Sequence, residues 1–96
     1  MAGCKKDNEN IAEGMEYVAQ LDYISALECF TEAEDEGEDE KLLARGKGIA
    51  YMGMTKYPEA QESFLEALSY SNGIVEDVDY DINMYLAAVY TKTGQY

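Results

Sequence analysis

One feature of this sequence restricts its fold more than any other: a segment that occurs twice at a fixed spacing. The stretch from residue 21 to residue 33 returns at residues 55 to 67, a constant offset of 34 in the numbering. The same offset links two further pairs upstream in the same frame. Such self-similarity is typical of an array built from one structural unit repeated along the chain. The matching pairs are Gly14 and Gly48, Tyr17 and Tyr51, Tyr23 and Tyr57, Ala26 and Ala60, Phe30 and Phe64, and Ala33 and Ala67.

A third copy of the unit begins near the end of the chain. The segment Leu86–Tyr90 followed by Gly94–Tyr96 matches the first half of the unit. The offset from Tyr51 to Tyr90 is 39 rather than 34, so five residues are inserted between the second and third copies, most simply in a loop near Asn72. The predicted organisation is a tail at 1–7, repeat units at 8–38 and 41–72, an inserted acidic loop at 73–80 and the first helix of an incomplete third unit at 81–96.

The repeated pattern reads Gly-x-x-Tyr, then Ala-x-x-x-Phe, then a small residue three positions further on. At a period of 34 it resembles the tetratricopeptide repeat. It departs from that family where tryptophan is usual, at Asn10 and Ala44, and where a proline is usual between units, at Glu38 and Asn72. The resemblance implies an all-α array of antiparallel helix hairpins, an α-solenoid of about five helices. It also implies a scaffold for protein interactions.

Apolar residues at helical spacing predict where the helices of each unit lie. Asp22 offers a side-chain cap to the second helix, Pro58 fits the first turn of the fourth, and Gly37 and Asn72-Gly73 can turn left-handed after helices. The predicted helices cover 8–20, 23–36, 41–54, a stretch starting near residue 58, and 81–96.

Glycine inside a helix costs about 1 kcal/mol relative to alanine, so these helices need a reason for their glycines. By the family pattern, Gly14 is expected to face Ala26, and Gly48 to face Ala60, so that the paired helices approach closely. Gly46 and Gly53 allow two interpretations. Either they let the backbone of a ligand come near, or the helix simply tolerates them.

Composition excludes several classes of function. Twenty acidic residues against seven basic ones give a net charge of −13, which disfavours binding to nucleic acid and to anionic membranes. The sequence has no histidine, so it lacks Ser-His and Cys-His nucleophile pairs and the commonest metal ligand. Its carboxylates lie in charged runs rather than in the apolar settings that tune catalytic acids. We therefore expect no enzyme activity, no cofactor and no metal site.

The two cysteines have different surroundings. Cys29 lies in an apolar helical pattern beside Phe30 and is expected to be an inert packing residue. Ala2-Gly3-Cys4 resembles the end of a bacterial lipobox, which implies a lipid on Cys4 and a location outside the cytoplasmic membrane. An ordinary N-terminal tail on a cytoplasmic protein is an equal alternative.

The family resemblance further implies a concave surface lined by the first helix of each unit. The equivalent positions are mainly apolar and rich in methionine, which suits an amphipathic helix or an extended apolar peptide. Arg45 is the only candidate there for gripping acidic peptide tails and lacks the usual asparagine and lysine partners, so a clamp for such tails is not expected. In a competing interpretation, Val18, Met52 and Met84 pack between units instead. The predicted binding residues are Ile11, Met15, Val18, Leu42, Arg45, Gly46, Ile49, Met52, Gly53, Met84, Tyr85 and Ala88.

The incomplete third unit leads to a second hypothesis about function. Leu86 and Tyr90 should face a following helix, so we expect nothing in this chain to cover them. The same face could then join two copies of the chain into a dimer. The sequence thus predicts a scaffold that binds a protein or peptide of unknown identity or, alternatively, a self-assembling module of a lipid-anchored bacterial surface protein.

Overall fold

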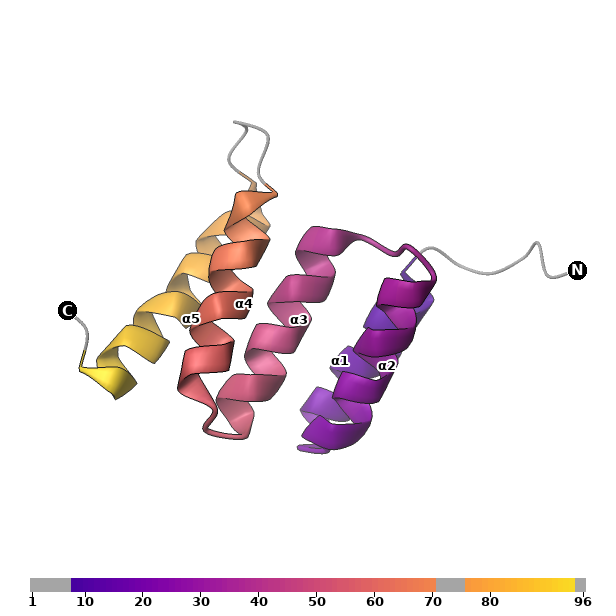
Figure 1. Ribbon diagram of the computed structural model, residues 1–96, viewed down its shortest axis with the longest axis horizontal. Helices are drawn as coiled ribbons and strands as arrows, with labels where there is room; N and C mark the ends of the chain where they lie inside the picture. Colours follow the sequence, from indigo (N-terminus) through magenta and orange to yellow (C-terminus); the bar gives the residue numbers. More distant parts are fainter. Residues whose placement is uncertain (1–7, 71–75, 95–96) are drawn as a thin grey trace, which may run out of the picture.

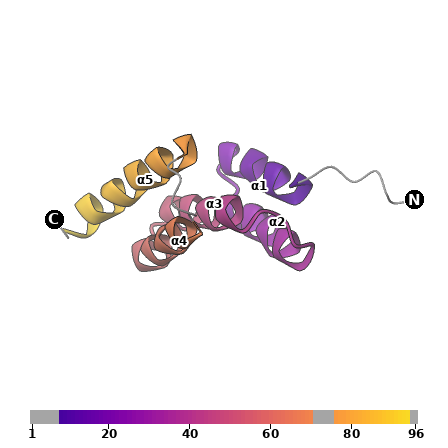
Figure 2. The ribbon, with the colours of Figure 1, turned by 90° about the horizontal axis from the view of Figure 1, so that it is seen from above.

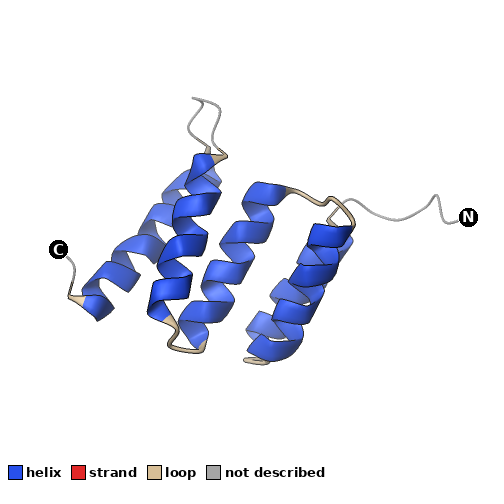
Figure 3. Cartoon of the chain, viewed as in Figure 1, coloured by secondary structure: helices blue, strands red, loops and turns tan. Residues whose placement is uncertain are grey.

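A computed structural model describes residues 8–70 and 76–94 of the chain (Figure 1). Every regular element in these residues is an α-helix, and each helix runs antiparallel to the next (Figures 1 and 3). The predicted all-α array of helix hairpins is therefore confirmed. The helices are α1 (Glu9–Ala19), α2 (Tyr23–Asp35), α3 (Glu40–Gly53), α4 (Tyr57–Ser69) and α5 (Asp77–Thr93).

The helices form an array with α3 at its centre. Figure 2 shows α1 and α5 on one side of the array and α2 and α4 on the other. Each helix packs against its neighbour in sequence, and α3 also contacts both α1 and α5. In contrast, no Cα atoms of α1 and α5 lie within 8 Å of each other. The two outer helices α1 and α5 therefore flank α3 on one side with their backbones apart.

The predicted helix ends are largely confirmed. Asp22 Oδ1 accepts a hydrogen bond from the Ser25 amide at 3.2 Å, as expected of an N-cap. Pro58 lies in the first turn of α4, and Gly37 has a φ of +72° directly after α2. Asn72 and Gly73 lie outside the described residues. The fifth helix begins at Asp77 rather than at residue 81, because a capping box between Glu76 and Asp79 starts it earlier.

The repeat is also visible in the backbone of the turns within the first two hairpins. Leu21 and Thr55, which are one repeat period apart, both adopt the left-handed conformation, with φ of +62° and +60°. In each turn the next amide closes back onto a tyrosine carbonyl, at 2.9 Å from Asp22 to Tyr17 and 2.8 Å from Lys56 to Tyr51. The two turns therefore have the same structure despite different side chains.

Two hydrophobic cores lie on either side of α3. The first is centred on Phe30 of α2 and the second on Phe64 of α4, and both rings are fully buried. The central helix contributes Leu43 and Ala50 to the first core, and Ala44 and Ile49 to the second. Burial on two faces makes α3 the helix through which the hairpins are joined.

The glycines of α1 and α3 make room for these two phenylalanine rings. A Cβ atom at Gly14 would overlap the Phe30 ring, and one at Gly48 would lie 2.6 Å from Phe64 Cε1. The expected close approach is present, and the atoms nearest to each added Cβ belong to the aromatic rings.

Candidate functional site

The predicted binding residues belong to α1, α3 and α5, and Figure 2 shows α1 and α5 on the same side of α3. Half-buried apolar residues from all three helices remain partly accessible. Each of them also packs against at least one core, apart from Ala88, so the alternative interpretation for Val18 and Met52 holds in part. The half-buried set is Met15, Val18, Leu42, Met52, Tyr85 and Ala88.

Four other predicted residues serve the interior or the hairpin packing instead. Ile11 and Ile49 are only 6% and 9% exposed and belong to the cores. A Cβ atom at Gly46 would lie 2.7 Å from Phe30 Cζ, and one at Gly53 would overlap the Tyr23 ring. Both glycines therefore make room for aromatic rings of α2, a role that neither interpretation of them included.

A sequence signal for these contacts exists in the spacing. Tyr23 and Phe30 are seven residues apart on α2, and Gly46 and Gly53 are seven apart on α3. In antiparallel helices the order reverses, so Phe30 meets Gly46 and Tyr23 meets Gly53. Matching two rings on one helix with two gaps on the next would have revealed the contacts without a structure.

Arg45 is held by residues of its own chain. Its Nε donates a hydrogen bond to Asp81 Oδ2 at 2.7 Å, and the guanidinium lies 5.8 Å from the centre of the Tyr85 ring. Arg45 is therefore neutralised within the predicted surface and presents no free cation to a partner. A neighbouring pair reinforces the same junction between α3 and α5.

The neighbouring pair is formed by Lys41 and Asp79, which are both buried. Lys41 Nζ lies 2.6 Å from Asp79 Oδ1 and 3.1 Å from Glu76 Oε1. The hydrogen bond to Asp79 is the main cause that raises the pKa of Lys41 above its ordinary value, with Glu76 adding to it. The acidic residues at the start of α5 thus tie the third unit to the second.

The outer face of α5 differs from the prediction. Leu86 is 6% exposed and packs in the second core, and Tyr90 is half-buried against that core. The expectation that nothing in the chain covers Leu86 was wrong, because α4 and α3 bury it. The exposed apolar residues of α5 are Tyr80 at 66% and Met84 at 72%, with Ala87 on the same side of the helix. Met84 therefore lies on this outer face.

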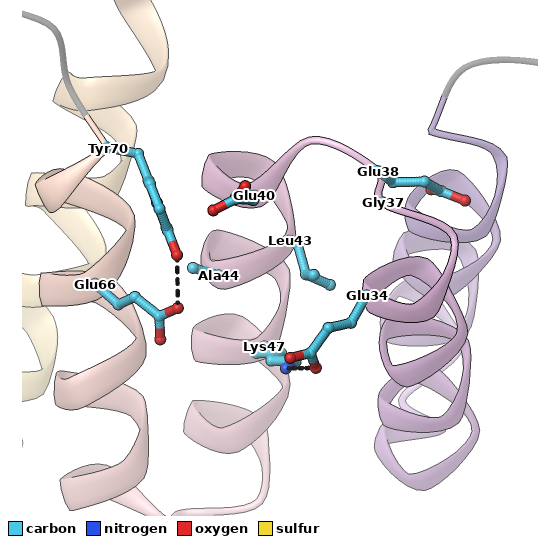
Figure 4. A pocket seen from close by; sticks show the side chains of 9 residues that line it. All are labelled: Glu34, Gly37, Glu38, Glu40, Leu43, Ala44, Lys47, Glu66 and Tyr70. Carbon is cyan, nitrogen blue, oxygen red and sulfur yellow. Dashed lines mark hydrogen bonds and ion pairs between the residues drawn. The ribbon is translucent and has the colours of Figure 1, made fainter.

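Sequence reasoning missed a cavity on the side of α3 where α2 and α4 lie. Its volume is about 260 Å³. Leu43 and Ala44 form a buried base, and Lys47 Nζ lies 3.0 Å from Glu34 Oε1 at one edge. Figure 4 shows carboxylates around this space, contributed by three helices and a loop. The lining residues are Glu34, Gly37, Glu38, Glu40, Leu43, Ala44, Lys47, Glu66 and Tyr70.

Tyr70 and Glu66 stand together at the opposite edge of this cavity. The Tyr70 hydroxyl donates a hydrogen bond to Glu66 Oε2 at 3.1 Å. That bond is the largest of the effects that raise the pKa of Tyr70 to about 12, followed by burial and by the Glu40 carboxylate. The rim of the cavity is therefore strongly electronegative.

Other chemistry in the described residues is limited. Burial is the main cause that raises the pKa of the Cys29 thiol, so it stays protonated and poorly nucleophilic. The described residues contain no cluster of three or more Cys, Asp or Glu that could hold a metal ion. None of the helices in the described part is long and apolar enough to cross a membrane. Cys4 lies outside the described residues.

Comparison with known proteins adds no relative to this picture. No protein-family model, no curated protein and no solved structure matches the chain.

Proposed function

We propose that this chain is a protein-interaction module of the tetratricopeptide-repeat type. Its partner, a helix or an extended peptide, binds on the side of α3 that α1 and α5 flank. The observation that carries the proposal is that no Cα atoms of these two outer helices lie within 8 Å of each other. We expect the half-buried apolar side chains of the central helix, Leu42 and Met52, to be accessible between them. The turns repeated at residues 21 and 55 support the assignment to a repeat family.

The residues on this face indicate a partner with an apolar contact surface. Met15 and Met52 are unbranched and polarisable, so they adapt to different side chains. Leu42 and Tyr85 add area on α3 and α5. Because Arg45 is already paired with Asp81, a carboxylate of the partner gains little there. We expect binding to depend on apolar burial and to change little with salt concentration.

Selection of peptides from a random library tests the proposal. A selected peptide should shift the amide resonances of Met15, Leu42 and Tyr85 in the wild-type protein. Leu42→Gln should weaken its binding about tenfold, as expected when roughly 1.4 kcal/mol of apolar contact is lost. Met84→Gln, on the outer face of α5, serves as the matched control and should leave binding unchanged. Peptides that bind equally well to both variants, or that shift only residues of α2 and α4, would contradict the proposal.

A second candidate function is self-assembly, and the exposed face of α5 favours it. Tyr80 and Met84 are two of the most exposed large apolar residues in the described part of the chain. In this proposal the face joins two copies, and a lipid on Cys4 would place the assembly outside the cytoplasmic membrane of a bacterium. Sedimentation of wild type and Met84→Glu over a range of concentrations tests it. A wild-type protein that remains monomeric throughout would rule it out.

A further inference from the structure

The cavity between α2, α3 and α4 combines an apolar base with a charged rim (Figure 4). Leu43 and Ala44, 6% and 3% exposed, supply the base. The volume of about 260 Å³ is smaller than the roughly 300–1,000 Å³ typical of sites for organic ligands. The space therefore fits a single side chain better than a molecule of cofactor size.

The carboxylates around the cavity are engaged to different degrees. Glu38 is engaged at the start of α1, where it accepts hydrogen bonds from the Asn10 amide at 3.1 Å and the Ile11 amide at 3.0 Å. Glu34 pairs with Lys47. Glu66 accepts one hydrogen bond from Tyr70, whose hydroxyl also interacts with the exposed Glu40 carboxylate on the facing helix. Because a carboxylate has about four lone-pair sites, Glu40 and Glu66 keep acceptor capacity towards the cavity.

Lys47 shows within the chain how a cation uses this space. Its side chain lines the cavity and is half-buried, while its ammonium group reaches Glu34 on α2. Long basic side chains commonly lay their aliphatic stems on apolar surface and keep the charged head at a polar edge. The opposite edge, at Glu40 and Glu66, offers a second position of the same kind. The raised pKa of Tyr70 is consistent with negative potential there.

We propose that this cavity binds one arginine or lysine side chain of a partner protein. The aliphatic stem lies against Leu43 and Ala44, and the charged head lies beside the Glu40 and Glu66 carboxylates. The net charge of −13 attracts basic segments from a distance, and the cavity gives one of their side chains a fixed place. This site goes beyond the function proposed above, because it lies on the other side of α3 and recognises charge rather than apolar surface.

Nuclear magnetic resonance titration with an acetylated Gly-Ser-Arg-Ser-Gly amide tests the proposal. The peptide should shift the amides of Leu43, Ala44 and Lys47 in the wild-type protein. The same peptide with citrulline in place of arginine keeps the shape but not the charge, and should not bind. Shifts spread over all the acidic helices, or equal binding of the citrulline peptide, would overturn the proposal.

A pair of matched double variants separates the cavity from general charge attraction. Glu40→Gln with Glu66→Gln should weaken binding roughly three- to tenfold, the range expected for two partly exposed ion pairs. Glu28→Gln with Glu62→Gln also removes two negative charges, but from exposed positions outside the cavity, and should change peptide binding little at equal ionic strength. Equal weakening by both pairs would show diffuse attraction only. Because the wild-type titration with both peptides is independent of the variants, a folding defect in either pair leaves the test decisive.

Discussion

The helices of the array are joined around two buried phenylalanine rings, Phe30 and Phe64. These two junctions accommodate their rings in different ways. At the first junction, Phe30 of α2 lies against Gly14 of α1 and Gly46 of α3, which leave space for its ring. At the second, Phe64 of α4 lies against Gly48 but stacks on Tyr85 of α5. The ring centroids of Phe64 and Tyr85 are 5.6 Å apart and nearly parallel, at 7°.

Gly46 and Tyr85 occupy equivalent positions, since they are related by the same offset that links Tyr51 of the second copy to Tyr90 of the third. At this position the first junction has a glycine that leaves space for Phe30, whereas the second has the Tyr85 ring stacked on Phe64. The second junction also has the ion pairs of Arg45 and Lys41 with α5. The residue type at an equivalent position of the repeat therefore depends on the side chains that the adjacent helix packs against it.

The largest expected effect comes from removing the two central rings in turn. Phe30→Ala and Phe64→Ala should each lower the free energy of unfolding by about 3–5 kcal/mol. Phe30→Ala should lie at the upper end, because glycines on both sides cannot fill the space that the ring leaves. Tyr85 can move into the space left by Phe64. Chemical denaturation of both variants checks the order, and a larger loss for Phe64→Ala would break the proposed difference between the junctions.

Substituting the glycines of α3 should sharpen the comparison further. Gly46→Ala places a methyl group against the fully buried Phe30 ring and should cost about 1–3 kcal/mol, despite the roughly 1 kcal/mol gained in helix propensity. Gly53→Ala meets Tyr23, which is half-buried and can turn outwards, so its effect should be smaller.

The control for the glycine series is the double variant Gly46→Ala with Phe30→Leu. Shrinking the ring should recover part of the stability relative to the additive expectation, because the two residues are in contact. Thermal and denaturant unfolding of the wild type, the two single variants and the double variant provide the double-mutant cycle. Strict additivity would show that Gly46 and Phe30 do not touch.

The two left-handed turns offer a smaller and opposite effect. Thr55→Gly should raise the free energy of unfolding by about 0.5–1 kcal/mol, because a β-branched residue is strained at a φ of +60°. Leu21→Gly should gain less, since leucine is not branched at Cβ and glycine adds entropy to the unfolded chain. The corresponding residue of the third copy, Gly94, already is glycine, with a φ of +77°. A loss of stability in Thr55→Gly would contradict the turn geometry.

Tyr70 connects the second unit to the cavity and gives a prediction for alkaline pH. Its pKa is raised, so the protonated phenol stabilises the folded state fully below pH 10, and this contribution is lost as the pH rises through about 12. The difference in absorbance between wild type and Tyr70→Phe, followed during alkaline titration, should show one tyrosine that ionises near 12. Glu66→Gln should move that ionisation to lower pH. A difference titration centred at the ordinary value near 10 would contradict the hydrogen bond to Glu66.

Much of the fold could be predicted from the sequence because it depends on local signals. The repeated Ala-x-x-x-Phe pattern, the cap at Asp22 and the glycine at position 37 each act within a few residues, and the structure has all of them. The predicted start of α5 was too late, because the acidic residues before residue 81 were interpreted as a loop. In the structure, the capping interaction of Glu76 with Asp79 starts the helix at Asp77. Local sequence patterns therefore predicted the presence of each helix better than the start of α5.

The candidate surfaces were less predictable because they depend on contacts between helices. The family resemblance implied that Gly46 and Ile49 lie on one accessible face, but rings and side chains of neighbouring helices cover both. Leu86 was expected to be uncovered, whereas α4 buries it. The cavity arises from the ends of α2 and α4 and from Lys47 between them, residues that no single repeat brings together.

The most direct test is to measure nuclear Overhauser effects from the ring protons of Phe30. The packing of α1 and α3 depends on how α2 inserts this ring between them. We predict strong effects to the α protons of both Gly14 and Gly46, with corresponding effects from Phe64 to Gly48 and Tyr85. If Gly14 instead shows its strongest contacts with the Ala26 methyl group and none with Phe30, the helices pack differently and the account of both junctions is wrong.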